Sequence, residues 1–241
     1  MRIFRSQLRQ ELTVMARNGE QLLLLVVVPI VLLVFFSQTD FLTTDSENKI
    51  DFLMPSILSL AVMSTAMVSL GIATGFERSY GVLKRLGTTP LGTRRLVLAK
   101  VAAICVIEIA QLVLLIFVGQ SLGWNPSRIN LVQILVLLLI GTSCFAGIGL
   151  TLAGRLRAEI NLAAQNGLYL ALLLLGGIFV SNDELPKTLG DVAQVLPSSL
   201  LSSLLRSSFN NNELVMTDAI ALCTWALTAC ALAVISFKWS D

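Results

Sequence analysis

Six long apolar stretches constrain the fold of this 241-residue chain more than any other feature. Each holds 19 to 26 residues, which is enough for a helix to cross a hydrocarbon core of about 30 Å at about 1.5 Å per residue. An ionised side chain at mid-bilayer costs about 2.5–3.5 kcal/mol, so spans are expected to be nearly free of charge. Glu108 is the one charged residue within the stretches, which are 21–39, 52–76, 101–122, 129–154, 160–182 and 219–237.

The composition excludes the common soluble classes. Only 13% of the residues are charged and 55% are hydrophobic, whereas a water-soluble domain carries about a quarter charged residues. The absence of histidine rules out HExxH zinc sites and Ser-His-Asp catalysis, so we expect no catalytic residue and no metal site on this chain. A net charge of +2 is too small to favour a nucleic-acid partner. The stretches lack strict alternation, which predicts an all-α integral membrane protein with six transmembrane helices.

Lysine and arginine predict the orientation of the spans, because cytoplasmic loops carry an excess of them. Thirteen of the 17 lie in the segments that begin the chain, follow the second and fourth stretches, and end the chain. Both termini are therefore predicted to be cytoplasmic, in a multi-pass protein of the cell (plasma) membrane, and we expect a bacterial origin. The chain divides into an N-terminal segment, 1–20, and a six-helix transmembrane domain, 21–241.

The N-terminal segment has the pattern of an amphipathic helix. Its apolar residues recur near helical spacing, with the arginines on the other side. Such a helix is predicted to lie in the headgroup layer, with its apolar face toward the acyl chains of the membrane lipids. The alternative is a basic anchor that orients the first span, and the two are compatible. The apolar residues are Ile3, Phe4, Leu8, Leu12 and Met15.

Small residues recur within the stretches and would let helices approach closely. We expect them to serve packing within the chain, with dimerisation as the alternative. They are Gly71, Gly75, Gly141, Gly147 and Gly149.

The segment 77–100, between the second and third stretches, is the most informative part of the sequence. Tyr80, Leu83 and Leu86 repeat at helical spacing, which predicts a short helix over 79–86. Pro90 then ends the helix, because proline disfavours helix at the residue before it. A short, sharply bounded helix under the membrane can insert into a groove of a cytosolic partner and transmit its movement. The alternative is an ordinary basic loop that happens to be helical.

This segment resembles the signature of the permease subunits of type-2 ABC exporters, which are similar in topology to the G subfamily of ABC transporters. The signature is an acidic-basic pair after the second span, a glycine-led basic string, a Thr-Pro-Leu turn, and a lysine that opens the third span. The resemblance extends along the whole chain and is closest to the daunorubicin-exporter-like, multidrug-resistance branch. It departs at Ser79-Tyr80, where many members carry further charge. The matching residues are Glu77-Arg78, Gly81-Val82-Leu83-Lys84-Arg85-Leu86, Thr89-Pro90-Leu91 and Lys100.

The resemblance implies that 79–86 is a coupling helix that docks on a separate ABC ATPase (nucleotide-binding) subunit. ATP and Mg would bind to that partner, because these 241 residues contain no GxxxxGK[ST] phosphate loop. A second permease, identical or paralogous, would complete a dimer. The residues implied in coupling to the ATPase are Glu77, Arg78, Gly81, Leu83, Lys84, Arg85, Leu86, Thr89 and Pro90.

Polar side chains within the stretches are candidates for a substrate pathway. Glu108 has Gln111 on the same helical face, and the resemblance includes Gln165-Asn166 at the head of the fifth span. A carboxyl in a span is either functional or bonded to a neighbouring helix. A secondary carrier or channel that uses Glu108 without an ATPase is therefore the alternative function. A membrane assembly factor or sensor that transports nothing is a third.

The segment 183–213 is predicted to lie outside the cell, yet it is partly apolar. A leucine stripe at helical spacing starts at Pro197 and ends at Arg206. The stripe predicts a re-entrant or interfacial helix that forms an outer gate around Pro197, Leu201 and Leu204. A helix that lies on the surface and gates nothing is the alternative.

These features together predict the permease of an ATP-driven exporter, with export itself implied by the resemblance. Apolar walls with few charges favour a hydrophobic or amphipathic substrate such as a drug, an antibiotic or a lipid. The residues leave open the substrate, the direction of transport, and the choice between a homodimer and a heterodimer.

Overall fold

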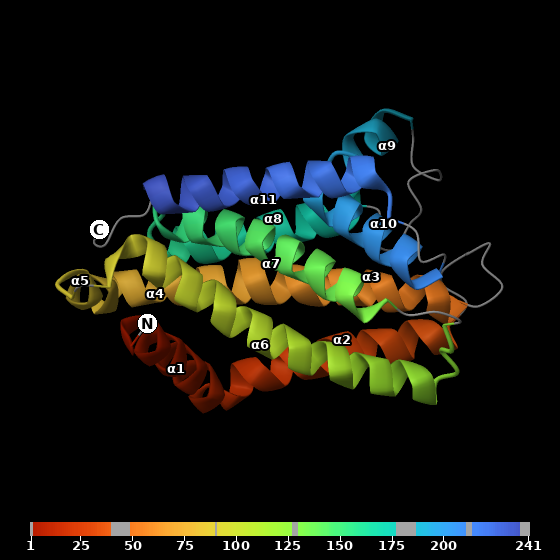
Figure 1. Cartoon of the computed structure of the whole chain (residues 1–241), viewed down its shortest axis with the longest axis horizontal. Helices are drawn as coiled ribbons and strands as arrows, with labels where there is room; N and C mark the ends of the chain where they lie inside the picture. Colours follow the sequence, from red (N-terminus) through yellow and green to blue (C-terminus); the bar gives the residue numbers. More distant parts are fainter. Residues whose placement is uncertain are drawn as a thin grey trace.

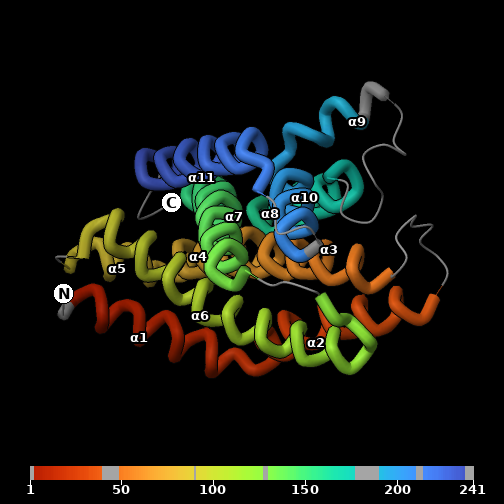
Figure 2. The backbone as a smooth tube through the Cα atoms, turned by 45° about the vertical axis from the view of Figure 1, so that its right-hand side comes forward, coloured from red at the N-terminus to blue at the C-terminus, as the bar shows by residue number. Residues whose placement is uncertain are grey.

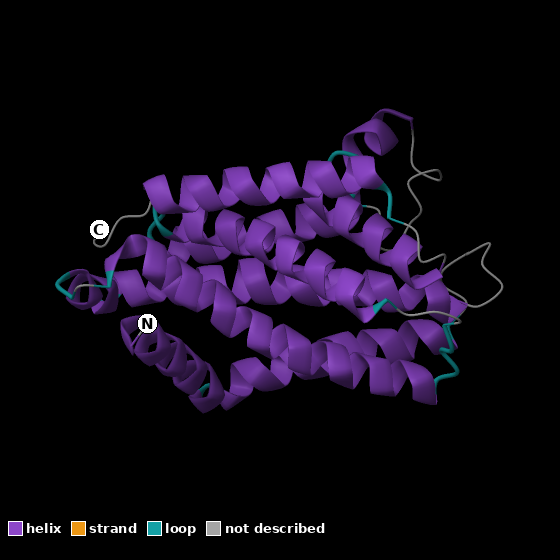
Figure 3. Cartoon of the chain, in the orientation of Figure 1, coloured by secondary structure: helices purple, strands orange, loops and turns teal. Residues whose placement is uncertain are grey.

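The computed structural model describes residues 2–39, 49–89, 91–126, 130–176, 187–210 and 214–236. These residues form helices joined by short turns, and no strand occurs among them (Figure 3). Six helical segments are long and apolar enough to cross a membrane by length and composition. They are α2, the continuous run of α3, η1 and α4, then α6, α7, α8 and α11. The predicted all-α fold with six spans is therefore confirmed.

One element, η1, is a π-helical segment that continues the α-helices on either side of it. The elements are α1 (Arg2–Arg17), α2 (Gly19–Gln38), α3 (Lys49–Met63), η1 (Ser64–Ser69), α4 (Leu70–Ser79), α5 (Val82–Gly87), α6 (Gly92–Ser121), α7 (Leu131–Ala153), α8 (Ala158–Leu175), α9 (Lys187–Ala193), α10 (Pro197–Asn210) and α11 (Met216–Ser236).

The second span is the central helix of the bundle. α3, η1 and α4 run without a break, and nearly every residue of α3 is buried. Figures 1 and 2 show α7, α8 and α10 on one side of this helix and α2 and α6 on the other. By contrast, α2 buries only Pro29 and Leu33, and its other apolar side chains are exposed or half-buried, as is typical of a helix that faces lipid.

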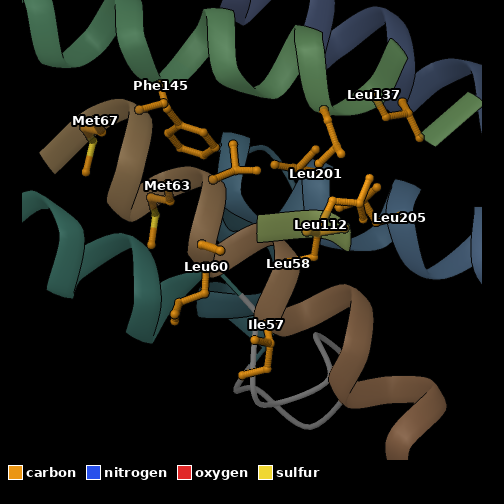
Figure 4. Close-up of a cluster of buried hydrophobic side chains, with 14 of the residues drawn as sticks. Ile57, Leu58, Leu60, Met63, Met67, Leu112, Leu137, Phe145, Leu201 and Leu205 are labelled. Carbon is orange, nitrogen blue, oxygen red and sulfur yellow. The ribbon is translucent and has the colours of Figure 1, made fainter. Parts of the chain in front are cut away.

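The core forms where the central helix meets α7 and α10. Figure 4 shows Met63 and Met67 of the central helix close to Phe145 of α7, with Leu201 and Leu205 entering from α10. All five side chains are fully buried. Because lipid tails are as apolar as leucine, close packing rather than exclusion of water stabilises such a core in a membrane.

Glycines let α7 approach two neighbours through backbone contacts. A Cβ atom on Gly147 would lie 2.6 Å from the carbonyl carbon of Ala229 in α11. A Cβ atom on Gly149 would lie 2.6 Å from the carbonyl oxygen of Met67 in η1. Backbone atoms cannot rotate away as a side chain can, so only glycine fits at either position. These contacts agree with the role in intrachain packing that the sequence predicted for both glycines.

The two ends of the bundle carry different elements (Figure 1). α1, α5, the start of α6 and the C-terminal end of α11 lie together at one end, which we call the N-terminal end. α9, α10 and the start of α11 lie toward the opposite end. The first and last described helices therefore reach the same side of the bundle, as six crossings require.

Two helices differ in extent from the predicted segments. α6 begins at Gly92, ahead of the apolar stretch 101–122, because it runs through the basic residues and buries Lys100 beside two carboxylates that neutralise it. The helix predicted over 79–86 is interrupted, since α4 ends at Ser79 and Gly81 adopts a left-handed φ of 72° before α5 begins. Some predicted positions lie outside the described residues: Pro90, 129, 177–182, 183–186, 211–213 and 237.

Candidate functional site

The segment predicted to couple the chain to a partner forms a turn and a short helix, α5, at the N-terminal end of the bundle (Figure 1). The turn is closed by the Tyr80 N–H, which donates to the Phe76 carbonyl at 2.9 Å, and by the Gly81 N–H, which donates to the Arg78 carbonyl at 3.0 Å. Glycine adopts the left-handed conformation of Gly81 without strain, unlike residues with a Cβ atom. Gly81 therefore sets the angle at which α5 leaves the central helix.

A small apolar cluster attaches α5 to the start of α6. Leu83 is fully buried there against Leu91 and Leu96, and Leu86 packs at the edge of the cluster. This cluster is separate from the main core of the bundle. The contacts hold α5 by one face against the start of α6.

The other face of α5 and the turn before it are exposed. Tyr80 keeps 75% of its surface exposed and Val82 keeps 38%. Lys84 and Arg85 are exposed on the same short helix. Tyrosine and arginine are enriched at protein interfaces, where they supply much of the binding free energy. We call Tyr80, Val82, Lys84 and Arg85 the docking face.

Two threonines end α5. The Thr88 hydroxyl donates to the Arg85 carbonyl at 2.8 Å, and the Thr89 hydroxyl donates to the Leu86 carbonyl at 2.6 Å. These bonds satisfy carbonyl groups that the end of a helix leaves without a partner. The helix therefore stops at Gly87, just before the predicted break. Pro90, which the sequence assigned to that break, lies outside the described residues.

A buried lysine joins three helices behind α5. The ammonium group of Lys100 in α6 lies 2.8 Å from a carboxylate oxygen of Glu77 in α4 and 3.0 Å from one of Glu11 in α1. The Lys100 side chain is 1% exposed. A buried charge of this kind is stable only when it is paired and hydrogen-bonded. We call Glu11, Glu77 and Lys100 the ion-pair cluster.

Arg78, the neighbour of Glu77, connects the central helix to the turn between α7 and α8. Its Nη2 donates to the carbonyl oxygen of Leu156 at 2.6 Å, and its side chain is buried. The acidic-basic pair of the predicted signature is therefore turned into the bundle. Glu77 and Arg78 fix helices in place, whereas Lys84 and Arg85 face outward from α5.

The role of α1 was only partly predicted. Gln7 and Glu11 are its most buried residues, and the Gln7 amide donates to the Glu11 carboxylate at 2.7 Å. Ile3, which the apolar pattern placed toward the lipid acyl chains, is 41% exposed. The sequence carried one signal for the contact of Glu11 with Lys100. Glu11 is an acidic residue one turn after Gln7 in a segment otherwise rich in arginine, which favours a contact with a buried cation.

Glu108 is buried where α6 meets α7. The Thr142 hydroxyl oxygen lies within hydrogen-bond reach of Glu108 Oε2 and 2.7 Å from the carbonyl oxygen of Leu138. A hydroxyl has one proton, so Thr142 satisfies both neighbours at once when the Glu108 carboxyl carries a proton and donates it. The other carboxyl oxygen has no hydrogen-bond partner among the described residues. Glu108 thus connects two helices.

Gln111, one turn further along α6, also connects helices. Its amide nitrogen donates to the carbonyl oxygen of Leu25 in α2 at 2.7 Å. Its amide oxygen accepts a bond from the Thr65 hydroxyl of η1 at 3.3 Å. The two polar residues that the sequence singled out in the third span therefore share one face, as expected, but they contact different helices.

Gln165 and Asn161 form a buried amide pair in α8. The Gln165 amide nitrogen donates to the Gly149 carbonyl of α7 at 2.9 Å, and the Asn161 amide nitrogen donates to the Gly71 carbonyl of α4 at 2.9 Å. A Cβ atom on Gly71 would overlap the Gln165 amide. The pair holds α8 against the central helix, whereas the adjacent Asn166 is exposed and points elsewhere.

A groove of about 430 Å³ lies between α2, the central helix and α8, and we call it the α2–α8 groove. Its walls are largely apolar, with Leu24 and Val28 from α2 and Tyr169 from α8. Asn166 is one of its few polar lining residues. The π-helical segment η1 also lines it, and such segments are frequent at functional sites. An apolar groove with a few polar groups suits an amphipathic small molecule.

The predicted outer helix is α10, and it is embedded in the bundle. It begins at Pro197 as predicted but continues past Arg206 to Asn210. Leu201 and Leu204 are fully buried, and Leu201 fills the space that Gly141 leaves on α7. The pattern of contacts with α3, α7 and α11 fits a helix inserted into the bundle better than one lying on its surface.

Arg206 attaches α10 to the central helix. Its guanidinium lies 3.9 Å from the centre of the Phe52 ring, a cation–π contact, and donates to the hydroxyls of Ser56 at 3.2 Å and Ser202 at 3.3 Å. Burial lowers the pKa of Arg206 to about 10, which leaves the group charged at neutral pH. The contacts with Phe52, Ser56 and Ser202 hold α10 against the central helix, whereas desolvation of the charge opposes its burial.

The chain was compared with known protein families and with curated proteins. The family model of the ABC-2 type transporter matches residues 3–210, from the first turn of α1 to the end of α10. No curated protein matches the chain. The family match covers well over half of the sequence and includes the docking face, the ion-pair cluster and the α2–α8 groove. The chain therefore belongs to the ABC-2 type transporter family.

Proposed function

We propose that the chain is the permease of an ATP-driven exporter that moves hydrophobic or amphipathic molecules, such as drugs, antibiotics or lipids, out of the cytoplasm. An ABC-2 membrane domain is a transmembrane component of a transporter and is not itself catalytic. ATP, Mg and the hydrolysis step then belong to a separate ATPase subunit. The observation that carries the proposal is α5, a helix of 6 residues that is anchored on one face and exposed on the other.

The docking face is the surface that would contact the ATPase. Tyr80 is largely exposed although it is aromatic, and it lies next to the basic residues Lys84 and Arg85. A partner groove with an apolar pocket for the tyrosine and acidic residues at its rim fits this chemistry. Leu83 lies on the opposite face and is buried, so it would anchor α5 rather than contact the partner.

The ion-pair cluster would transmit movement of α5 to the spans. α5 follows α4 directly in the chain and packs on the start of α6 through Leu83. Lys100 binds Glu77 of α4 and Glu11 of α1, so these three helices are tied together one turn behind α5. A push on α5 would therefore displace α1, α4 and α6 as a unit, which is the kind of rigid-body change that opens and closes transport pathways.

The N-terminal end of the bundle is the end proposed to face the cytoplasm. It carries α5 and most of the basic residues, which favour the cytoplasmic side.

A second permease, identical or paralogous, would pack against the exposed apolar faces of α2 and α8. Leu24 on α2, which lines the α2–α8 groove, and Leu170 on α8 are both more than half exposed. Within the family, we propose that this chain belongs to the drug-exporting branch.

The α2–α8 groove is the proposed substrate path. It is largely apolar, it contains hydroxyl and amide groups but no charged lining residue, and η1 forms part of it. Of the polar residues predicted for the pathway, Asn166 lines the groove. Glu108, Gln111 and Gln165 instead bond to neighbouring helices, so we propose that they hold the shape of the path.

A secondary carrier that uses Glu108 is the competing function. The observation in its favour is the Glu108 oxygen without a hydrogen-bond partner among the described residues. Against it, Glu108 is buried between α6 and α7 and does not line the α2–α8 groove. A carrier would need this carboxyl to alternate between the two sides of the membrane.

Co-purification tests the docking face. The variant Tyr80→Ala/Lys84→Glu/Arg85→Glu removes its aromatic and basic groups without touching the buried Leu83. The permease is purified in mild detergent, and the retained ATPase subunit is identified by peptide mass and by ATP hydrolysis. We expect a stoichiometric ATPase on the unmodified chain and its loss from the variant.

The matched control is Arg155→Glu/Arg157→Glu, because both arginines are exposed in the turn between α7 and α8. This control reverses two charges, as the α5 variant does, and we expect it to retain the ATPase. An unmodified chain that retains no ATPase, or an α5 variant that retains as much as the control, would contradict the proposal.

A further inference from the structure

A second groove, of about 450 Å³, opens between α6 and α11 on the outside of the bundle, with α7 behind it. We call it the α6–α11 groove. Its volume falls within the range of about 300–1,000 Å³ typical of ligand sites. It shares no lining residue with the α2–α8 groove, and it lies toward the N-terminal end, where the start of α6 meets the last turns of α11 (Figure 1).

The interior of the α6–α11 groove has no polar group to offer. Val97 and Val101 of α6 face Ala231 and Val234 of α11 across it. Ser143 lies behind them, but its hydroxyl donates to the Leu139 carbonyl at 2.7 Å. An occupant of the interior must therefore be apolar along its length.

The Ser143 carbonyl and the Cys230 thiol also satisfy each other. The Cys230 sulfur donates to the Ser143 carbonyl oxygen at 3.2 Å. The hydroxyl of Ser143 and the thiol of Cys230 thus already donate within the chain, so these two lining residues offer a polar ligand no free donor. Desolvating a polar group without a partner is unfavourable, so the groove selects against such ligands.

Within the part of the chain that the structure describes, one cation lines the mouth of the groove. Arg94 lies in the first turn of α6, and its side chain is exposed. It precedes Val101 by seven residues, which is about 10 Å along a helix. The groove therefore has a positive group at one end and an apolar channel that extends from it into the depth of a membrane.

We propose that the α6–α11 groove binds an anionic phospholipid, with an acyl chain lying between α6 and α11 and the phosphate bound by Arg94. Basic pockets between transmembrane helices are suited to anionic headgroups, and arginine binds phosphate through several N–H groups at once. The charge at the mouth distinguishes this site from the exposed apolar faces of α2 and α8, where any lipid tail would serve. The inference depends on the chain crossing a membrane and not on what the chain transports.

Lipid retention tests the site. The chain is reconstituted in vesicles of phosphatidylcholine with a minor fraction of phosphatidylglycerol and extracted in mild detergent, and phosphatidylglycerol per chain is counted by mass spectrometry of the intact protein. Loss of one cation near an anionic headgroup predicts about fivefold less retained phosphatidylglycerol for Arg94→Gln. The matched control Arg155→Gln, an exposed arginine outside the groove, is expected to retain it.

A second pair of variants tests the apolar channel. Ala231→Phe fills the groove from an exposed position and is expected to lower retention to a similar extent, whereas Ala110→Phe, an exposed alanine of α6 outside the groove, is not. Equal loss in Arg94→Gln and Arg155→Gln would overturn the site, since charge alone would then explain retention. Equal retention of phosphatidylcholine and phosphatidylglycerol, or a second copy of the chain covering the groove in place of lipid, would also overturn it.

Discussion

The ammonium group of Lys100 lies 2.8 Å from a carboxylate oxygen of Glu77, and this ion pair joins the start of α6 to the end of α4. Both residues belong to the segment 77–100, which the sequence predicted to couple the chain to a partner, yet neither lies on α5 or on the docking face. A third residue, Glu11, brings α1 into the same cluster at 3.0 Å. The coupling segment therefore has two parts, an exposed docking face and a buried cluster that connects it to the spans.

Removing the cation of the ion-pair cluster is expected to destabilise the fold. In Lys100→Ala two carboxylates remain close together without a counter-charge, which costs about 3 kcal/mol of unfolding free energy. Thermal unfolding of the purified variant in detergent measures this loss. Lys84→Ala removes an exposed lysine of α5 and is expected to change stability by less than about 0.5 kcal/mol.

A variant of the ion-pair cluster without charges tests whether unpaired charge causes the loss of stability in Lys100→Ala. The variant Glu11→Gln/Glu77→Gln/Lys100→Met keeps the side-chain shapes and leaves no unpaired charge, so most of the stability lost in Lys100→Ala should return. If this variant unfolds at the same temperature as Lys100→Ala, unpaired charge is not the cause of the loss and the interpretation of the cluster is wrong.

The contact between α7 and η1 requires glycine at position 149. Gly149→Ala places a Cβ atom 2.6 Å from the Met67 carbonyl oxygen, so α7 and the central helix must separate. We expect a loss of about 1–3 kcal/mol, the usual range for overpacking. Gly167→Ala is the control, because a Cβ atom there meets nothing within 4 Å. Alanine in a helix stabilises by up to about 1 kcal/mol relative to glycine. The unfolding temperature should therefore fall in Gly149→Ala and rise in Gly167→Ala.

Glu108→Gln distinguishes a structural carboxyl from a proton carrier. Glutamine has the same shape and can donate from its amide to Thr142, so the link between α6 and α7 is kept. We expect the rate of ATP-driven export by the reconstituted complex to change less than about twofold. Such a change is well below the tenfold that corresponds to about 1.4 kcal/mol of free energy. Loss of transport in a variant that still folds and still stimulates its ATPase would assign Glu108 a proton-transfer role.

Filling the α2–α8 groove is expected to block the substrate path. Asn166→Phe introduces a large side chain from an exposed position of α8, where the fold has room for it. Efflux of a lipophilic dye should fall while the ATPase remains bound. Val113→Phe, at an exposed position of α6, does not line the groove and lies outside the proposed contact with a second permease, so it should leave efflux intact. Equal inhibition by the two variants would contradict this position of the path.

Much of the fold follows from local features of the sequence. The six spans could be predicted because each is a long apolar run, and the cost of charge in a bilayer makes such runs easy to recognise. The extension of α6 to Gly92, ahead of the apolar stretch 101–122, is harder to recognise. Lys100 looks like the edge of a span when residues are taken one at a time, but Glu11 and Glu77 neutralise it inside the protein.

The sites were harder to predict, because they depend on residues that are distant in the sequence. Glu11 is 89 residues from Lys100, and the amide of Gln165 reaches a carbonyl of α7 across the α7–α8 turn. The π-helical η1 has no clear local signal, since its residues resemble those of the helix on either side. A short helix in the segment 77–100 was predicted, but the exposure of Tyr80, which the sequence grouped with Leu83, and the inward position of Glu77 and Arg78 require the packed bundle.

ATP-driven dye uptake into sealed inside-out vesicles tests the central claim most directly. The permease is reconstituted with and without its co-purified ATPase, and a lipophilic fluorescent dye is followed into the lumen after ATP is added outside, on the side of the N-terminal end. The proposal predicts uptake only with both proteins, and its loss in Tyr80→Ala/Lys84→Glu/Arg85→Glu although that chain remains folded. Uptake by the permease alone, driven by a proton gradient and without an ATPase, would contradict it.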